Sequence, residues 1–202
     1  MMRSIATAVL AIWLAALSGG AQETKPHVVL HTQLGDIELE LDAVHAPATV
    51  ANFLRYVNGG FYAGGAFSRT VTMQNQPSND IKIEVIQANI NPARKAEAFP
   101  NIPLERTSVT GLHHLDGTIS MGRSASPDSA ASEIFICIGD QPSLDFGGRR
   151  NPDGQGFAAF GQVVRGMDVV RKIQVSPAEK QKLTPPVGIS GAEVVKAQAG
   201  KK

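Results

Sequence analysis

An alternating run of apolar and acidic residues is the feature that most constrains the fold of this chain. Ile37, Leu39 and Leu41 take every second position of residues 36–41, and acidic side chains take the positions between them. Alternation with a period of two is typical of a β-strand that buries one face. A second apolar run at residues 28–32 precedes it, and Gly35 lies between the two. The pattern predicts a β-hairpin that turns at Gly35, with its acidic face exposed to solvent.

Most of the remaining chain predicts short strands separated by turns, together with two helices. Pro47 is suited to the first turn of a helix, and apolar residues recur at helical spacing over residues 47–57 and again over 166–173. The expected strands are residues 66–72, 81–87, 117–121, 133–138, 158–164 and 193–195. Closing such a sheet removes its exposed edges, so a mainly β, closed or nearly closed structure is expected. Periodicity alone leaves barrel and sandwich open.

The N-terminal residues have the pattern of a secretory signal peptide. Arg3 precedes an apolar run at residues 5–17, and the small residues Gly19, Gly20 and Ala21 follow it. An uncleaved membrane anchor is the alternative, but spanning a bilayer takes about 20 apolar residues. We therefore expect residues 1–21 to be removed on export to the periplasm or the medium, which leaves no membrane span. The expected remainder is a linker at 22–26, one domain at 27–197 and a disordered tail at 198–202.

The composition excludes several classes of function. The 19 Lys and Arg residues nearly balance the 18 Asp and Glu residues, so no basic field is available for nucleic acid. Cys137 is the only cysteine and lies in an apolar run, which predicts a buried, unreactive thiol and no internal disulfide. His113 and His114 are adjacent but have no accompanying ligand cluster, so no metal site is expected.

A series of short motifs gives a more specific indication. In chain order these are Gly35-Asp36-Ile37, Ala46-Pro47-Ala48-Thr49-Val50-Ala51-Asn52-Phe53, Phe61-Tyr62, Phe67-Ser68-Arg69, Val85-Ile86-Gln87, Gly117-Thr118-Ile119-Ser120-Met121, Ser132-Glu133-Ile134-Phe135-Ile136 and Phe160-Gly161-Gln162-Val163-Val164-Arg165-Gly166-Met167-Asp168. Each motif is weak by itself, but their order and spacing together are specific. Over residues 27–195 the chain resembles the cyclophilins, a family of peptidyl-prolyl isomerases.

The resemblance implies a fold, an activity and a site. The fold is a closed, eight-stranded antiparallel β-barrel capped by two α-helices, with a peptide groove on its outer surface. The activity is cis-trans isomerisation of Xaa-Pro bonds in exported polypeptides, by a monomer that needs no cofactor and no metal. Arg69 and Gln87 are the implied catalytic residues. The implied substrate-binding residues are Phe67, Val85, Met121, Gly122, Arg123, Glu133, Phe135, Leu144 and Phe157.

These residue types suit the chemistry. Rotation about a peptide bond passes a twisted state about 18–20 kcal/mol above the planar one, because amide resonance is lost. The prolyl nitrogen then regains a lone pair, to which the charged, forked guanidinium of Arg69 can donate a hydrogen bond. An interaction made only in the twisted state lowers the barrier, as catalysis requires. Gln87 is suited to hold a neighbouring carbonyl or backbone group.

Several positions depart from the usual pattern of that family. Ser68 and Phe157 stand where histidine is usual, Glu84 where phenylalanine is usual, Glu133 where glutamine is usual and Ser143 where an aromatic residue is usual. The segments at residues 73–82 and 146–156 are also longer than compact bacterial members need. Glu133 is expected to pair with Arg69 or Arg123 in the empty protein.

Two alternatives to an enzyme stay open. One is a proline-peptide binding module or holdase chaperone on the same fold, favoured by the altered groove residues. The other is a β-barrel carrier of small apolar ligands, which requires a hollow interior.

Overall fold

The computed structural model describes residues 25–196 of the chain. The predicted signal peptide, residues 22–24 of the predicted linker and the predicted tail lie outside the described residues. No helix within residues 25–196 has the length and apolar character needed to cross a membrane.

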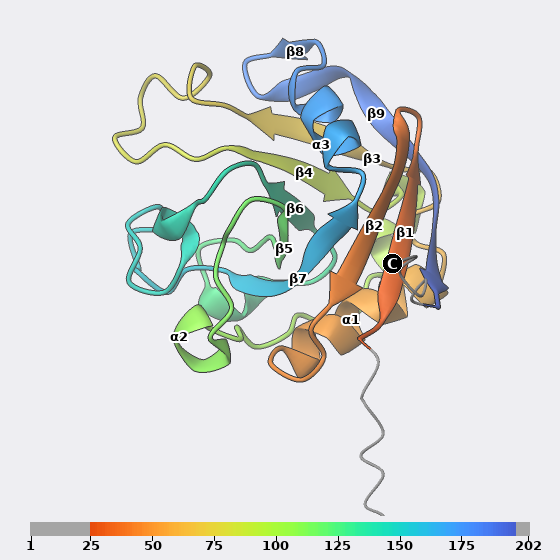
Figure 1. Ribbon diagram of the computed structural model, residues 1–202, viewed down its shortest axis with the longest axis horizontal. Coiled ribbons are helices and arrows are strands. Elements are labelled where there is room, and N and C mark those ends of the chain that lie inside the picture. Colours follow the sequence, from red (N-terminus) through yellow and green to blue (C-terminus); the bar gives the residue numbers. More distant parts are fainter. Residues whose placement is uncertain (1–24, 197–202) are drawn as a thin grey trace, which may run out of the picture.

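Eight antiparallel strands close into a barrel (Figure 1). Around the ring they are ordered β1-β2-β7-β5-β6-β4-β3-β9, and β9 also pairs with β1, which closes the ring. A two-residue strand, β8, pairs only with β9. The strand bounds are β1 His27–Thr32, β2 Gly35–Leu41, β3 Gly65–Val71, β4 Val85–Asn89, β5 Thr118–Met121, β6 Ile134–Cys137, β7 Ala158–Arg165, β8 Ala178–Glu179 and β9 Lys182–Val195. The expected eight-stranded closed barrel is confirmed.

The predicted hairpin is present, but its outer face is not uniformly wet. Strands β1 and β2 pair from His27 to the turn at Gly35, whose φ of +128° favours glycine. The apolar residues of β2 point into the barrel and are fully buried. Glu38, expected to be exposed, is only 4% exposed. It is covered because His27 Nδ1 lies 2.9 Å and Arg165 Nη2 lies 2.8 Å from its carboxylate oxygens.

The two predicted helices lie at opposite ends of the barrel (Figure 1). Helix α1, Pro47–Asn58, begins at a proline, and the backbone N–H groups of Ala48 and Thr49 donate to the carboxylate of Glu105 at 3.0 and 2.7 Å. A carboxylate at this position suits both the unpaired N–H groups and the helix dipole. Helix α3, Met167–Gln174, buries Val169, Val170 and Ile173. The short α2, Thr107–Thr110, and three 3-10 helices at Pro92–Glu97, Pro127–Ser129 and Pro142–Leu144 were not predicted.

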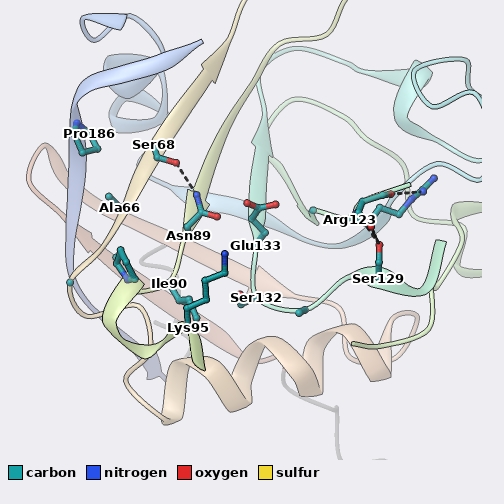
Figure 2. Close-up of a pocket in the computed structure, with 16 residues that line it drawn as sticks. Ala66, Ser68, Asn89, Ile90, Lys95, Arg123, Ser129, Ser132, Glu133 and Pro186 are labelled. Atoms are coloured by element: carbon teal, nitrogen blue, oxygen red, sulfur yellow. Dashed lines mark hydrogen bonds between the residues drawn. The ribbon is translucent and has the colours of Figure 1, made fainter. Parts of the chain in front are cut away.

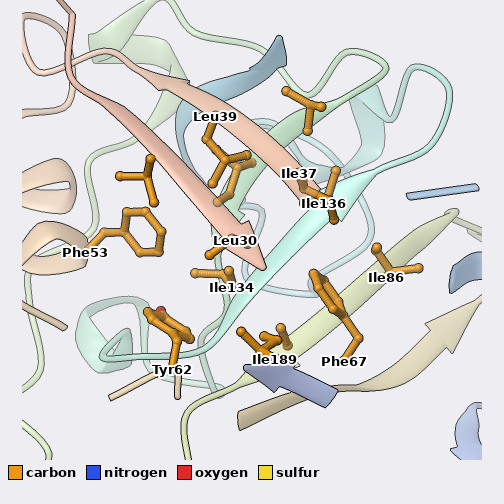
Figure 3. Packing of buried hydrophobic residues seen from close by; sticks show 14 of the residues in the cluster. Leu30, Ile37, Leu39, Phe53, Tyr62, Phe67, Ile86, Ile134, Ile136 and Ile189 are labelled. Atoms are coloured by element: carbon orange, nitrogen blue, oxygen red, sulfur yellow. The ribbon is translucent and has the colours of Figure 1, made fainter. Parts of the chain in front are cut away.

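The interior of the barrel is filled by side chains (Figure 3). Phe53 from α1 packs against Tyr62 and Phe160, with ring centroids 5.6 and 5.3 Å apart. Aliphatic residues from the surrounding strands complete the cluster, among them Leu30, Ile37, Leu39, Ile86, Ile134 and Ile136. A packed interior leaves no room for an apolar ligand, so the carrier hypothesis is wrong.

Candidate active site

A β-bulge determines which way Arg69 points. Phe67 pairs with Ala88 and Arg69 pairs with Gln87, so Ser68 is an extra residue on β3. Residues two apart on a regular strand share a face. The bulge instead leaves Phe67 fully buried in the core and Arg69 half-buried on the outer surface. It therefore places the guanidinium outside the barrel, directly opposite Gln87 of β4.

The guanidinium of Arg69 is held by two amide side chains. Its Nη1 donates to Gln87 Oε1 at 2.8 Å. Its Nε and Nη2 both donate to Gln181 Oε1, at 2.9 and 2.6 Å. Gln181 lies in the turn between β8 and β9, and its own Nε2 donates to the backbone oxygen of Asn75. Gln181 is thus itself held in position, and both partners of the fork carry no charge.

The charge of Arg69 is not neutralised by a direct ion pair. Within residues 25–196 no carboxylate lies within 4.0 Å of its guanidinium nitrogens. Burial lowers the pKa of Arg69 below its usual value, and the nearby charge of Glu133 offsets only part of this shift. The expected pair of Glu133 with Arg69 or Arg123 is not formed, because Arg69 binds the two glutamines and Arg123 binds Asp153. Glu133 acts on Arg69 only through space.

An apolar pocket of about 230 Å³ opens beside the guanidinium. Five apolar side chains line it. Val85 belongs to β4 and Phe135 to β6, Ile83 and Phe157 come just before β4 and β7, and Leu144 ends the 3-10 helix Pro142–Leu144. Phe135 and Phe157 meet edge to face with centroids 5.3 Å apart. Beneath them lie Val71 and the buried Cys137, whose pKa is raised by burial. The pocket thus places a cluster of apolar side chains next to polar and charged ones, among them Arg69 and Gln87.

Histidine and aspartate side chains support the pocket from below. The ring of His114 stacks on Phe135 at a centroid distance of 5.9 Å. Its Nδ1 lies 2.6 Å from Asp145 Oδ1, and its Nε2 lies 3.0 Å from Ser120 Oγ. His113 contacts the other oxygen of Asp145 at 2.9 Å. His114 is therefore fixed on both sides and orients the ring that forms one wall of the pocket.

A second cavity, of about 680 Å³, adjoins the apolar pocket (Figure 2). Gly122, Arg123 and Glu133 line both cavities and separate them. Arg123 is fixed there, because its Nη2 lies 2.9 Å from Asp153 and its Nε donates to Gly156 O at 2.8 Å. Ser68, Asn89 and Lys95 line the far side of the second cavity. The two cavities lie next to each other along the outside of β4, and together they are called the groove.

The structure brings together most, but not all, of the expected site residues. Arg69, Gln87, Val85, Gly122, Arg123, Glu133, Phe135, Leu144 and Phe157 all line the apolar pocket. Phe67 and Met121 do not; both belong to the barrel core, at 0% and 1% exposure. Their assignment as substrate-binding residues is therefore wrong.

Other residues of the pocket were missed. These are Ile83, Arg150 and Asn151, and Gln181, which binds Arg69 without lining the pocket, was missed as well. Alternation along the strand could have identified Ile83, since it shares a face with Val85 and Gln87. Glu84 points away from the pocket, toward Gln174 of α3. Arg150, Asn151 and Gln181 carry no local signal.

Comparison with known proteins identifies the family of this chain. Residues 27–194 match the family model described as "Cyclophilin type peptidyl-prolyl cis-trans isomerase/CLD". The chain is 36% identical over 202 residues to peptidyl-prolyl cis-trans isomerase A of Dickeya dadantii, covering 96% of this chain and 98% of that protein. It is 35% identical over 147 residues to peptidyl-prolyl cis-trans isomerase B of Escherichia coli, covering 73% and 83% respectively.

A solved structure is similar in fold. A cyclophilin-type isomerase of Cryptosporidium parvum superposes with a TM-score of 0.68 at 18% identity, covering 85% of this chain and 98% of that one. From the family match over nearly all described residues, and from the close curated relatives, the chain belongs to the cyclophilin-type peptidyl-prolyl cis-trans isomerases.

Proposed function

We propose that this isomerase turns Xaa-Pro bonds with Arg69 as the catalytic donor and the apolar pocket as the seat of the proline ring. The observation that carries the proposal is the charged fork, held by two neutral amides, beside a compact apolar pocket. The ring of proline is apolar and needs such a surface, while the nitrogen of its twisted amide needs a donor. Both needs are met within one groove.

The neutral partners of Arg69 matter for catalysis. A carboxylate partner would stabilise the guanidinium equally in the ground state and the transition state, and would compete with the substrate nitrogen. Amide oxygens orient the fork without cancelling its charge, and three of its five N–H groups are used. The remaining donors stay free to bind the prolyl nitrogen when it becomes pyramidal. Such a bond stabilises the twisted state selectively.

Gln87 has two roles in this mechanism. Its Oε1 accepts from Arg69, and its Nε2 makes no hydrogen bond to any described residue. That N–H₂ group is suited to hold a backbone carbonyl of the substrate while the other side of the bond rotates. Together the two side chains need to lower the barrier by about 4 kcal/mol to give a thousandfold acceleration.

Exchange between cis and trans forms of a short Ala-Pro peptide, measured by NMR, tests this mechanism. Arg69→Ala should reduce the exchange rate about 10²–10³-fold, because an electrostatic donor to the transition state is lost. Arg69→Lys should recover only part of the rate, since lysine lacks the fork. The control is Arg171→Ala, which removes an exposed arginine paired with Asp116 on the protein surface. It should leave the rate unchanged.

The same peptide separates this mechanism from the holdase alternative. Binding is measured by chemical-shift titration in parallel with exchange. A protein that binds the peptide without accelerating its exchange is a binding module. If Arg69→Ala keeps the wild-type exchange rate, Arg69 is not the catalytic donor.

We also propose that residues 1–21 direct export and that residues 27–197 act as a single monomeric domain on exported polypeptides. The signal-like N-terminus supports export, and one continuous barrel over the described residues supports a single domain. Intact mass of the protein from the periplasm and the medium tests cleavage before Gln22, and light scattering tests the oligomeric state. A full-length mass or a dimer would contradict the corresponding part.

A further inference from the structure

Two long loops meet at one end of the apolar pocket. Residues 73–82 lead into β4, and residues 146–156 lead toward β7. The two are joined by Arg150, whose Nη1 donates to the backbone oxygen of Ile81 at 2.6 Å and whose backbone N–H donates to Ser143 O at 3.1 Å. Arg150 is partly buried and lines the pocket, as does its neighbour Asn151. The loops thus bring a further guanidinium to the pocket, besides those of Arg69 and Arg123.

The pocket has an excess of positive charge. Its charged lining residues are Arg69, Arg123, Arg150 and Glu133. Arg123 is neutralised by Asp153 at 2.9 Å, whereas Arg150 has no carboxylate within 4.0 Å among residues 25–196. Burial and the charge of Arg69 lower the pKa of Arg150, so the two cations are close enough to repel. An anionic group in the pocket would relieve this repulsion.

The order of residues along β4 locates that excess charge. Ile81 and Ile83 precede the strand, Gln87 lies opposite Arg69, and Asn89 lines the second cavity. Arg150, bound to Ile81, therefore lies at the end of the groove away from the second cavity. If the proline ring occupies the space between Val85 and Phe135, Arg150 lies beyond one end of it and the second cavity beyond the other.

We propose that Arg150 is a specificity residue that makes the groove prefer Xaa-Pro peptides with an acidic side chain flanking the proline on the Ile81 side. The inference rests on the proposed function, since it takes the proline ring to lie in the apolar pocket. Most donors of Arg150 remain unused by described residues, because only Nη1 has a hydrogen-bond partner. A carboxylate is the group that a planar guanidinium binds with two parallel hydrogen bonds.

Matched peptides test the proposal. Two pairs of blocked Ala-Pro peptides are compared, one pair with Glu or Gln N-terminal to the Ala-Pro unit and the other with Glu or Gln C-terminal to it. Full-length mature protein should show a kcat/KM roughly 3- to 10-fold higher for Glu than for Gln in one of the pairs, the range of one partly buried ion pair. Arg150→Gln should bring that ratio close to one, and Arg150→Lys should retain part of it.

Arg149→Gln is the matched control. It removes the same formal charge one residue away, from an exposed side chain that does not line the pocket. It should keep the Glu/Gln ratio of the wild type. The proposal would be overturned if the wild type gave a Glu/Gln ratio of kcat/KM near one in both pairs of peptides. It would also be overturned if Arg149→Gln and Arg150→Gln lowered that ratio equally. Arg69→Ala, measured on the Gln peptides, reports separately on the proposed catalytic mechanism.

Discussion

Gln181 offers the sharpest test of how the catalytic fork is oriented. Its Oε1 accepts from Arg69 Nε at 2.9 Å and Nη2 at 2.6 Å, from a turn that lies 112 residues away in sequence. We predict that Gln181→Ala lowers kcat without abolishing the fold. Gln87 still holds Nη1 in this variant, but the other edge of the guanidinium is free to turn.

The size of the effect follows from the bonds that are lost. Hydrogen bonds to a charged donor contribute about 1.5–3 kcal/mol each, and water replaces most of that at a half-buried site. A remaining loss of about 1–2 kcal/mol in positioning corresponds to a roughly 5- to 30-fold lower kcat. KM should change little, because Gln181 does not line the apolar pocket. Gln181→Glu keeps an acceptor but adds a charge, and should also slow turnover, because the carboxylate holds the guanidinium in an ion pair.

Line-shape NMR of an Ala-Pro peptide over a range of concentrations separates kcat from KM, and thermal unfolding reports on the fold. The control is Gln174→Ala, which removes an amide of the same type that donates to Glu84 and does not contact Arg69. If Gln181→Ala turns over within twofold of the wild type, or if Gln174→Ala is equally slow, the orientation argument is refuted. If Gln181→Glu is faster than the wild type, the neutrality of the partners does not matter.

Three further predictions concern the pocket and the charged clusters around the barrel. Phe135→Ala should raise KM for Ala-Pro peptides at least tenfold and lower the free energy of unfolding in urea by about 3–5 kcal/mol, because a 5% exposed ring is lost; an unchanged KM would contradict the assigned ring seat. Burial raises the pKa of Asp145, but hydrogen bonds from His114 and its neighbour outweigh it and lower the pKa below the usual value. Asp145 thus stabilises the fold above about pH 4 and stops doing so as pH falls through its lowered pKa, so Asp145→Asn should lower the melting temperature at neutral pH and much less in acid. A hydrogen bond to Asp36, opposed by burial, raises the pKa of His31. His31→Gln should therefore lower the melting temperature slightly at about pH 5.5, and this effect should vanish as the pH rises past the raised pKa of His31. An equal difference in melting temperature from the wild type at about pH 5.5 and at a pH well above that pKa would refute this.

The sequence predicted the parts of the fold that depend on local pattern. Alternation located the β1–β2 hairpin, and helical spacing located α1 and α3 within a few residues. Strand β9 was expected only at residues 193–195 but runs from Lys182 to Val195. Pro185 and Pro186 lie inside this strand, although proline weakens a strand. They lie where the β3–β9 register shifts, between the pairs Phe67–Val187 and Arg69–Lys182, so they do not interrupt the sheet.

The sequence predicted which residues meet in the pocket mainly where they belong to a recognisable motif. Arg69, Gln87 and Phe135 lie where the resemblance implied, whereas Phe67 does not. The bulge at Ser68 turns Phe67 and Arg69, two positions apart, to opposite faces, and alternation cannot detect an extra residue. Gln181 and Arg150 reach the site through pairings between distant segments. Such contacts leave no periodic trace in a single sequence.

The way the ring is closed sets the order in which this protein can fold. Strand β9, residues 182–195, pairs with both β1 and β3. Until β9 has paired, one edge of β1 and one edge of β3 remain exposed. Contacts between segments so far apart in sequence are slow to form, and open edges invite pairing with other chains. A polypeptide lacking this last strand should therefore aggregate rather than remain a less stable barrel.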